Sequence, residues 1–130
     1  MIKIRSKLKF ISTEDGGRRT PLFNVTNETP YRPNLVFGFL GSLSDLKRDG
    51  YYKFDDDNWS DSYKSIDGSI QPGVEQVLPG MPIEAKISIR DTNYINNFLR
   101  ENETFLVREG GRVIATGEVL SILEKPSMHN

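Results

Sequence analysis

The chain has 130 residues, the length of one ordinary domain, and its 17 lysines and arginines against 18 aspartates and glutamates leave a formal net charge of −1. This length can bury a core without disulfides, and the near-neutral charge gives no overall attraction to nucleic acid or to an anionic membrane. Because cysteine is absent, disulfides, thiolate nucleophiles and cysteine-ligated zinc are excluded, and a reducing cytoplasm is the natural compartment.

The chain begins with a strict alternation of apolar and charged residues. Within residues 2–10 the apolar side chains occupy even positions, and Lys3, Arg5, Lys7 and Lys9 occupy odd ones. This pattern predicts a half-buried strand. Its cations could meet phosphates, although a solvated face or a charged edge that prevents aggregation is the commoner explanation. Neither a signal peptide nor a membrane span is visible, so we expect a soluble cytoplasmic protein without membrane contact.

A turn-rich stretch follows, and then a short apolar run. Residues 12–20 are centred on Gly16-Gly17, and the prolines at 21, 30 and 33 favour extended or looped chain because proline lacks an N–H group. The run Asn34–Leu40 is apolar and β-type in composition. It predicts a short buried strand.

Residues 41–68 form a polar excursion that carries the acidic tract Asp55–Asp57 and five aromatic side chains. That is too many aromatics for a disordered linker, and a long loop in a compact domain is usually functional or has structure of its own. We expect an ordered insertion in which residues 51–54 add a short strand or Ser42 caps a helical turn. Exposed aromatic residues are good anchors for protein partners. The protein-binding candidates are Tyr51, Tyr52, Trp59 and Tyr63.

The second half of the chain again has the composition of strands and tight turns. Pro79-Gly80 suits the centre of a type II turn, and Ile83–Ile89 alternates as a half-buried strand does. Residues 91–102 are either one helical turn or a loop, and 125–130 form a flexible tail.

The segment Thr104–Leu123 organises the rest, because it reads as two strands folded back across Gly110-Gly111. Its second arm is apolar on both faces, which indicates cover on both sides for part of its length, and Gly117 is the natural bend. Short strands without a confident helix predict an all-β sandwich or small barrel.

No catalytic or cofactor motif emerges from the chain. The one histidine, His129, lies in the tail, and neither a phosphate-binding loop nor a dinucleotide fingerprint is present. The acidic tract lacks the glycine and distal glutamate of a calcium loop. We therefore expect a noncatalytic binding module with no metal, no cofactor and no bound GTP.

The pattern acid-Gly-Gly-Arg occurs twice, at Asp15–Arg18 and at Glu109–Arg112. The plain explanation is two similar tight turns. The sharper one is that glycines let backbone N–H groups approach a phosphate, which the arginines then grip.

Four motifs in the same order resemble the C-terminal (third) β-barrel domain of bacterial elongation factor Tu. They are GGRRTPLF (16–23), YRPNLVF (31–37), SIQPGVEQVLPGMPI (69–83) and FLVREGGRVIATGEV (105–119). The resemblance implies one stand-alone, six-stranded antiparallel barrel over residues 1–124, with the insertion at 41–68. In that family the domain packs on the GTPase domain, helps to hold the T-stem backbone of aminoacyl-tRNA, and contacts the exchange factor Ts.

The resemblance also implies RNA-facing residues. Arg18 and Arg19 match tRNA-facing positions of the family, with Arg19 in place of a histidine, and Asn34 stands where the family usually has glutamine. Glu109 and Gly110 match the acidic residue and first glycine of the family's REGGR turn. The sequence departs from the family in having no counterpart of the GTPase or second domain, and in Met81-Pro82 where the family has Asp-Asn.

Three functions are consistent with this resemblance. The first is a protein-interaction module that docks onto translation machinery or mimics the elongation factor toward its protein partners. The second is weak binding of the aminoacyl-tRNA T-stem backbone, which would fall steeply with salt because few phosphates are contacted. The third is an immunity or decoy protein against a toxin that uses the elongation factor.

Overall fold

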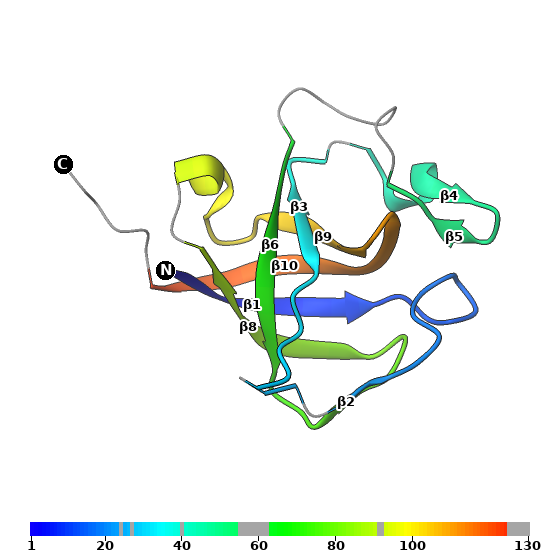
Figure 1. Cartoon of the computed structure of the whole chain (residues 1–130). Helices are drawn as coiled ribbons and strands as arrows, with labels where there is room; N and C mark the ends of the chain where they lie inside the picture. The colour runs from blue at the N-terminus through cyan, green and yellow to red at the C-terminus, as the bar shows by residue number, and fades with distance from the viewer. Residues whose placement is uncertain (24, 27, 40, 55–62, 91–92, 125–130) are drawn as a thin grey trace.

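A computed structural model describes residues 1–23, 25–26, 28–39, 41–54, 63–90 and 93–124, and these form a closed barrel of six antiparallel strands (Figure 1). The strand order around the barrel is β1-β10-β9-β3-β6-β8. The strands are β1 (Ile2–Phe10), β3 (Asn34–Phe37), β6 (Lys64–Pro72), β8 (Pro82–Ile89), β9 (Thr104–Glu109) and β10 (Arg112–Glu124). The prediction of a small all-β barrel is therefore confirmed. In the described part of the chain no helix is long and apolar enough to cross a membrane.

Short elements connect or flank the barrel strands. In the described residues β2 pairs with β7 and β4 pairs with β5, and the 3₁₀ helices η1 and η3 lie in the connections. Their bounds are β2 (Leu22–Phe23), η1 (Leu43–Leu46), β4 (Lys47–Arg48), β5 (Tyr51–Tyr52), β7 (Gln76–Val77) and η3 (Asn93–Phe98). The predicted turn at Pro79-Gly80 is present, since Gly80 has φ 85° and the Met81 N–H donates to the Leu78 carbonyl at 3.0 Å.

The β9–β10 hairpin forms as the sequence predicts, and β10 pairs with β1 on its other side. Gly110 at its turn has φ 58°, in the left-handed region that favours glycine. The nearest register shifts of β10 fall on either side of Gly117, between Val113 and Ala115 and between Val119 and Ser121. The role that the structure gives this glycine is one of packing. A Cβ atom there would lie 2.3 Å from the Phe105 ring, so glycine makes room for that ring.

The barrel interior is filled by the alternate side chains that the strands point inward. On β1 every even residue is buried and every odd one is exposed, and β8 alternates in the same way. Three aromatic rings stack within this interior, with centroids 5.0 Å apart between Phe37 and Phe105 and 6.2 Å apart between Phe37 and Phe98. The Ser6 hydroxyl lies in the same inward row and has no hydrogen-bond partner within the described structure.

A second apolar cluster lies on the outer face of β3, β9 and β10. Along β3, Leu35 and Phe37 belong to the interior, whereas Val36 between them points outward, and β9 alternates in the same way. On β10, Val113 belongs to the second cluster and the next two residues belong to the interior, at a register shift. We call the five buried residues of this group the outer cluster: Val36, Leu46, Phe54, Leu106 and Val113. The two-sided burial predicted for the 112–123 arm is confirmed where it passes this cluster.

The outer cluster is closed by the segment that follows β3. Ser42 precedes η1, and its backbone N–H donates to the Asp45 carboxylate at 3.0 Å. The β4–β5 hairpin turns at Asp49 and Gly50, whose φ values of 55° and 88° match a two-residue hairpin turn. The side chains of Leu46 and Phe54 pack on the outside of the barrel, and the Phe54 N–H donates to the Gly111 carbonyl at 2.8 Å. This segment therefore adds ordered structure, as expected.

The structure differs from the expected insertion boundary of 41–68. Residues 64–68 belong to barrel strand β6, where Lys64 pairs with Phe37 and Gly68 pairs with Ile89. The polar composition KSIDG suggested a loop, because this part of β6 turns polar residues outward and has only Ile66 and a glycine facing in. The addition to the barrel thus ends before Lys64. The acidic tract, Trp59 and the tail at 125–130 lie outside the described residues.

Candidate functional site

The two Gly-Gly turns lie together at one end of the barrel, beside the β4–β5 hairpin. We call this region the double-glycine end; it comprises residues 16–19, 49–53 and 108–112 together with Tyr31 and Asn34. Arg112 joins the two turns, because its Nη1 donates to the Gly17 carbonyl at 3.5 Å. The sequence repeat therefore corresponds to one place in the structure.

Gly16 and Gly17 have to be glycines because other backbone segments pass too close to leave room for a Cβ atom. A Cβ atom on Gly16 would lie 2.5 Å from the Gly50 carbonyl oxygen and from the Tyr51 Cα atom. A Cβ atom on Gly17 would lie 1.9 Å from the Ile11 carbonyl oxygen. The chain that comes close to these glycines is the protein's own hairpin and strand end. At the second pair, by contrast, nothing lies within 4 Å of a Cβ atom placed on Gly110 or Gly111.

Glu109 is the centre of a small polar cluster. Its Oε2 accepts an ion-pair hydrogen bond from Arg18 Nη1 and a hydrogen bond from the Tyr31 hydroxyl at 2.5 Å. The Arg18 guanidinium also lies 5.6 Å from the centroid of the Tyr31 ring. Burial and the hydrogen bond to Glu109 raise the pKa of Tyr31, so its hydroxyl stays protonated and serves as a donor. The side chains of Arg18 and Glu109 are only 20% and 33% exposed.

Asn34 is held by its neighbours on both adjacent strands. Arg108 on β9 donates through Nε to Asn34 Oδ1 at 2.6 Å, and Asn34 Nδ2 donates to Asp67 Oδ1 on β6 at 3.0 Å. The pairs follow from the strand register, which places Asn34 opposite both residues. The Arg108 guanidinium also lies 4.9 Å from the centroid of the Phe54 ring. Both ends of the Asn34 amide are thus engaged.

The five residues proposed as RNA-facing have different surroundings. Arg18, Glu109 and Asn34 bond to other side chains of this region, as described. Arg19 and Gly110 are exposed, and Arg19 makes no ion pair or hydrogen bond with any described residue. Two contributors to this region, Tyr31 and Arg108, were not singled out from the sequence, although both lie inside motifs that were quoted, YRPNLVF and FLVREGGR.

The aromatic hairpin covers one side of this region. Tyr51 lies between two cations, with its ring centroid 4.3 Å from Arg112 Cζ and 4.9 Å from Lys53 Nζ. Lys53 also donates to Asp49 at 3.1 Å, and the hydrogen bond with Tyr51, more than the one with Asp49, raises the pKa of Lys53. The Tyr52 and Tyr63 side chains are half-buried against the outer cluster.

A shallow hollow of about 330 Å³ lies where residues 51–54 meet the β9–β10 turn. Tyr51, Lys53 and Phe54 line one wall, and Glu109, Gly111 and Arg112 line the other. Its chemistry is that of a binding surface with two aromatic rings, two cations and one carboxylate. Among the described residues no group of three or more histidine, aspartate or glutamate side chains is arranged to hold a metal ion.

The fold and this region together define a small, closed antiparallel β-barrel with an aromatic hairpin folded over one end. No protein-family model matches the chain.

Proposed function

We propose that the chain is a noncatalytic protein-binding module, which docks onto translation machinery or presents a surface like the elongation factor Tu third domain to that factor's protein partners. The proposal is supported by the closed six-stranded antiparallel barrel that the resemblance implies. It would act in the cytoplasm without metal, cofactor or GTP. The four motifs that carry the resemblance include parts of five barrel strands, the β2–β7 sheet and both Gly-Gly turns of the double-glycine end.

The observation that favours a protein partner is the internal use of arginine at the double-glycine end. Arg18 pairs with Glu109, Arg108 bonds to Asn34, and Arg112 bonds to the Gly17 carbonyl. An arginine that already has a partner must exchange it before it can grip a phosphate. The β4–β5 hairpin instead presents Tyr51, whose ring contacts the cations of Lys53 and Arg112. Tyrosine and arginine are enriched among the residues that contribute most to the affinity of protein interfaces.

Binding to purified exchange factor Ts tests this proposal, because the resembling domain contacts that factor. We expect saturable binding by calorimetry and competition with full-length elongation factor Tu. Replacement of Tyr51 by alanine should weaken binding by roughly tenfold. The matched control is Tyr94→Ala, which removes a half-exposed tyrosine from η3, outside the double-glycine end. Absence of both binding and competition would contradict the proposal.

The alternative function, weak binding of the aminoacyl-tRNA T-stem, has one specific observation in its favour. Arg19 is exposed and unpaired among the described residues, and it lies beside Arg18 in the motif that resembles the tRNA-facing one. Titration of aminoacyl-tRNA at about 50 mM and about 200 mM salt separates the two functions, since phosphate contacts weaken steeply with salt. RNA binding that is lost in Arg18→Ala/Arg19→Ala would favour this alternative over the protein-binding proposal.

A further inference from the structure

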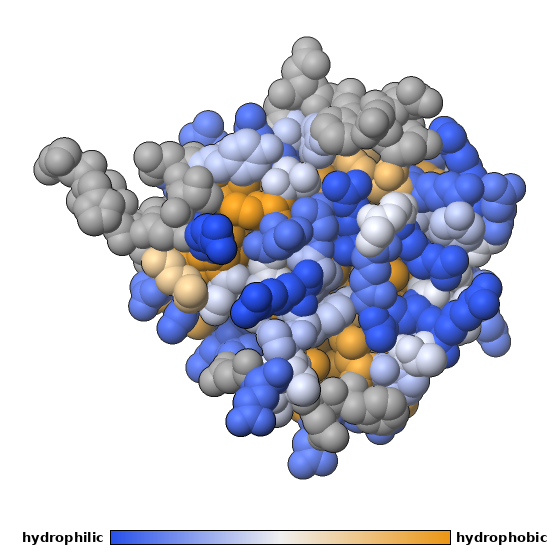
Figure 2. Space-filling view, in the orientation of Figure 1, coloured by the Kyte–Doolittle hydropathy of each residue, from blue (hydrophilic) through white to orange (hydrophobic). Residues whose placement is uncertain are grey.

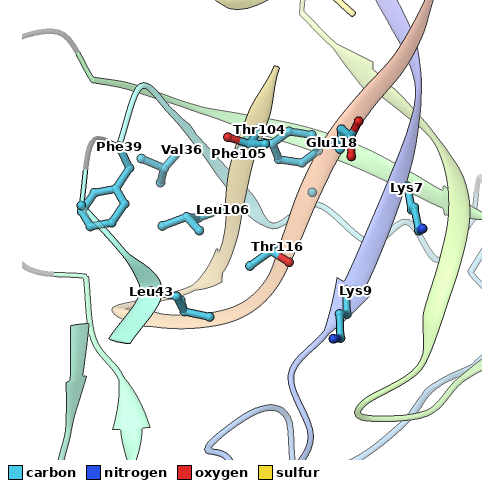
Figure 3. Close-up of a pocket in the computed structure, with 12 residues that line it drawn as sticks. Lys7, Lys9, Val36, Phe39, Leu43, Thr104, Phe105, Leu106, Thr116 and Glu118 are labelled. Carbon is cyan, nitrogen blue, oxygen red and sulfur yellow. The ribbon is translucent and has the colours of Figure 1, made fainter. Parts of the chain in front are cut away.

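A groove of about 390 Å³ crosses the outer face of the barrel (Figure 3), and none of its lining residues belongs to the double-glycine end. Strands β1, β3, β9 and β10 form its floor, and the chain that leads from β3 into η1 forms one wall. The groove exists because the segment between β3 and η1 covers β3 and β9 but does not reach β1. The outer face is thus half covered.

Strand register places the lining residues in two rows. In the first row Lys9 lies opposite Thr116, Thr116 opposite Leu106, and Leu106 opposite Val36. Across β1, β10, β9 and β3 this row spans three inter-strand spacings, or about 14 Å. The groove therefore changes from charged to apolar along its length, with a hydroxyl between.

The second row is shorter and lies beside the first. Lys7 lies opposite Glu118, and Glu118 lies opposite Thr104. This row adds a second lysine to the charged end, and it places one carboxylate next to that lysine. Both threonine hydroxyls of the two rows are available to hydrogen-bond a ligand, since no described residue bonds to either of them.

The apolar end is a continuation of the outer cluster. Val36 and Leu106 form its base, and Phe39 and Leu43 stand half-buried at its wall (Figure 3). A Cβ atom on Gly41 would lie 2.8 Å from the Phe39 ring, so glycine at this position leaves room for the ring. This end has the shape and composition to receive one bulky apolar side chain.

Among the residues that line the groove, the charged end has two lysines, Lys7 and Lys9, against one glutamate, Glu118. Lys9 lies between Pro82 and Thr116 and has no carboxylate opposite it, whereas Lys7 lies between Glu84 and Glu118. Both lysines are exposed, and neither forms an ion pair with a described residue. This end is therefore complementary to a carboxylate.

We propose that the groove binds an acidic peptide segment of a partner protein, with one bulky apolar side chain at the wall of Phe39 and Leu43 and carboxylates at Lys7 and Lys9. The inference rests on the proposed function, because it names a surface and a ligand class for a protein-binding module. A separation of about 14 Å corresponds to about four residues of extended chain. An inorganic anion would meet only the lysines and would leave the apolar end empty.

The test is fluorescence anisotropy with a labelled peptide of sequence SFGDEDE. Two control peptides change one feature each: SSGDEDE lacks the aromatic side chain, and SFGKRKR reverses the charge. We expect saturable binding of the first peptide, weaker binding of the second and none of the third. Binding of the first peptide should weaken with added salt, because exposed charges are screened.

Variants of the groove sharpen the test. Lys9→Gln should weaken peptide binding by about threefold and Lys7→Gln/Lys9→Gln by about tenfold, the range expected of exposed ion pairs. Glu118→Gln should strengthen binding by about twofold, because it removes a negative charge that would repel the carboxylates of the peptide. The matched control is Arg5→Gln, which removes a cation from the same outward row of β1 but outside the groove. Thermal unfolding checks that each variant is folded.

Each outcome decides between the inference and the function on which it rests. Equal binding of SFGDEDE and SFGKRKR, or unchanged binding in the lysine variants, would overturn the inference. If exchange factor Ts binds while the peptide does not, the proposed function stands and the groove is not its acidic-peptide site. If the peptide binds and its affinity follows the variants while exchange factor Ts does not bind, the groove inference stands and the translation-related function falls.

Discussion

The barrel interior and the outer cluster are both apolar, but they are closed by different means. The interior receives residues from all six barrel strands, and the hydrogen-bonded ring of strands encloses it. The outer cluster receives only Val36, Leu106 and Val113 from the barrel, and its cover consists of Leu46 and Phe54 from the chain between β3 and β6. On the face viewed in Figure 2, polar side chains dominate and apolar residues show in the gaps between them. Because the ring of strands encloses the interior without this cover, we expect the interior to stay packed when the covering residues are replaced.

Replacement of Phe37 by alanine should have the largest effect. This side chain is fully buried and stacks on Phe98 and Phe105 inside the barrel. Its loss should lower the free energy of unfolding by about 4 kcal/mol, as large cavities in closed cores do. Urea denaturation followed by circular dichroism measures the change. A loss below about 1 kcal/mol would mean that the interior relaxes around the cavity and is not the rigid part of the molecule.

Replacement of Phe54 by alanine should cost less, about 2 to 3 kcal/mol, because the cover has one free side and can collapse onto the gap. The effect should also be local. Hydrogen exchange should rise in the β4–β5 hairpin, at residues 47–52, while β1 and β8 remain as protected as in the parent protein. Leu43→Ala, at the half-buried groove wall, is the smaller matched change. Equal loss of protection throughout the barrel would show that the cover and the ring unfold as one unit.

Tyr31 lies between the interior and the surface, because it packs against the interior and donates to Glu109. The pH dependence of the free energy of unfolding therefore tests its contribution to stability. Its pKa is raised in the folded protein, chiefly by burial. The unfolded chain therefore loses this proton first, near pH 10, and the stabilising contribution, complete below that pH, declines as the pH rises further. The expected decline is about 1.4 kcal/mol per pH unit.

The Tyr31→Phe variant isolates this contribution from the other tyrosines and lysines, which titrate in the same range. Urea denaturation at pH 9, 10 and 11 should show a shallower loss of stability in the variant than in the parent. Parallel pH profiles would mean that Tyr31 ionises equally easily in the folded and unfolded chains.

Ser6→Ala should have the smallest effect, and it should be favourable. The Ser6 hydroxyl is fully buried in the inward row of β1 and bonds to nothing in the described structure. Removal of an unsatisfied hydroxyl should raise the free energy of unfolding by about 1 kcal/mol. Thermal unfolding of the variant measures this. A decrease in stability would indicate that the hydroxyl has a partner, such as a buried water molecule.

The sequence predicted the interior better than the cover, for a physical reason. Alternation along β1 and β8 reports which face is buried, and Gly110-Gly111 reports a hairpin, so both were visible from local pattern. The first part of β6 was not visible, because its outward residues are polar and Gly68 has no side chain to reveal its inward position. The two covering residues, Leu46 and Phe54, are apolar residues in polar surroundings whose burial depends on a distant surface.

The sequence identified several residues of the site, but not the ion pair and hydrogen bonds that join them. Arg18 and Glu109 were both singled out, as separate RNA-facing candidates, yet they are 91 positions apart and their ion pair depends on how the barrel closes. The same is true of Arg108 and Asn34, which meet because β3 and β9 are neighbours. Arg19 shows the opposite case, since it is exposed in the structure and its role stays a prediction.

The position of β1 in the ring has a consequence for the growing polypeptide. This strand is synthesised before the other five strands of the barrel, yet it pairs with β8 and with β10, whose partner residues are 82–89 and 115–124. On the ribosome it must wait until β10 has been made, and pairings so distant in sequence form slowly. During that wait its apolar face is uncovered and both of its edges are open to strands of other chains. The four cations of its outward row would keep such nascent chains apart by mutual repulsion until the last strand arrives.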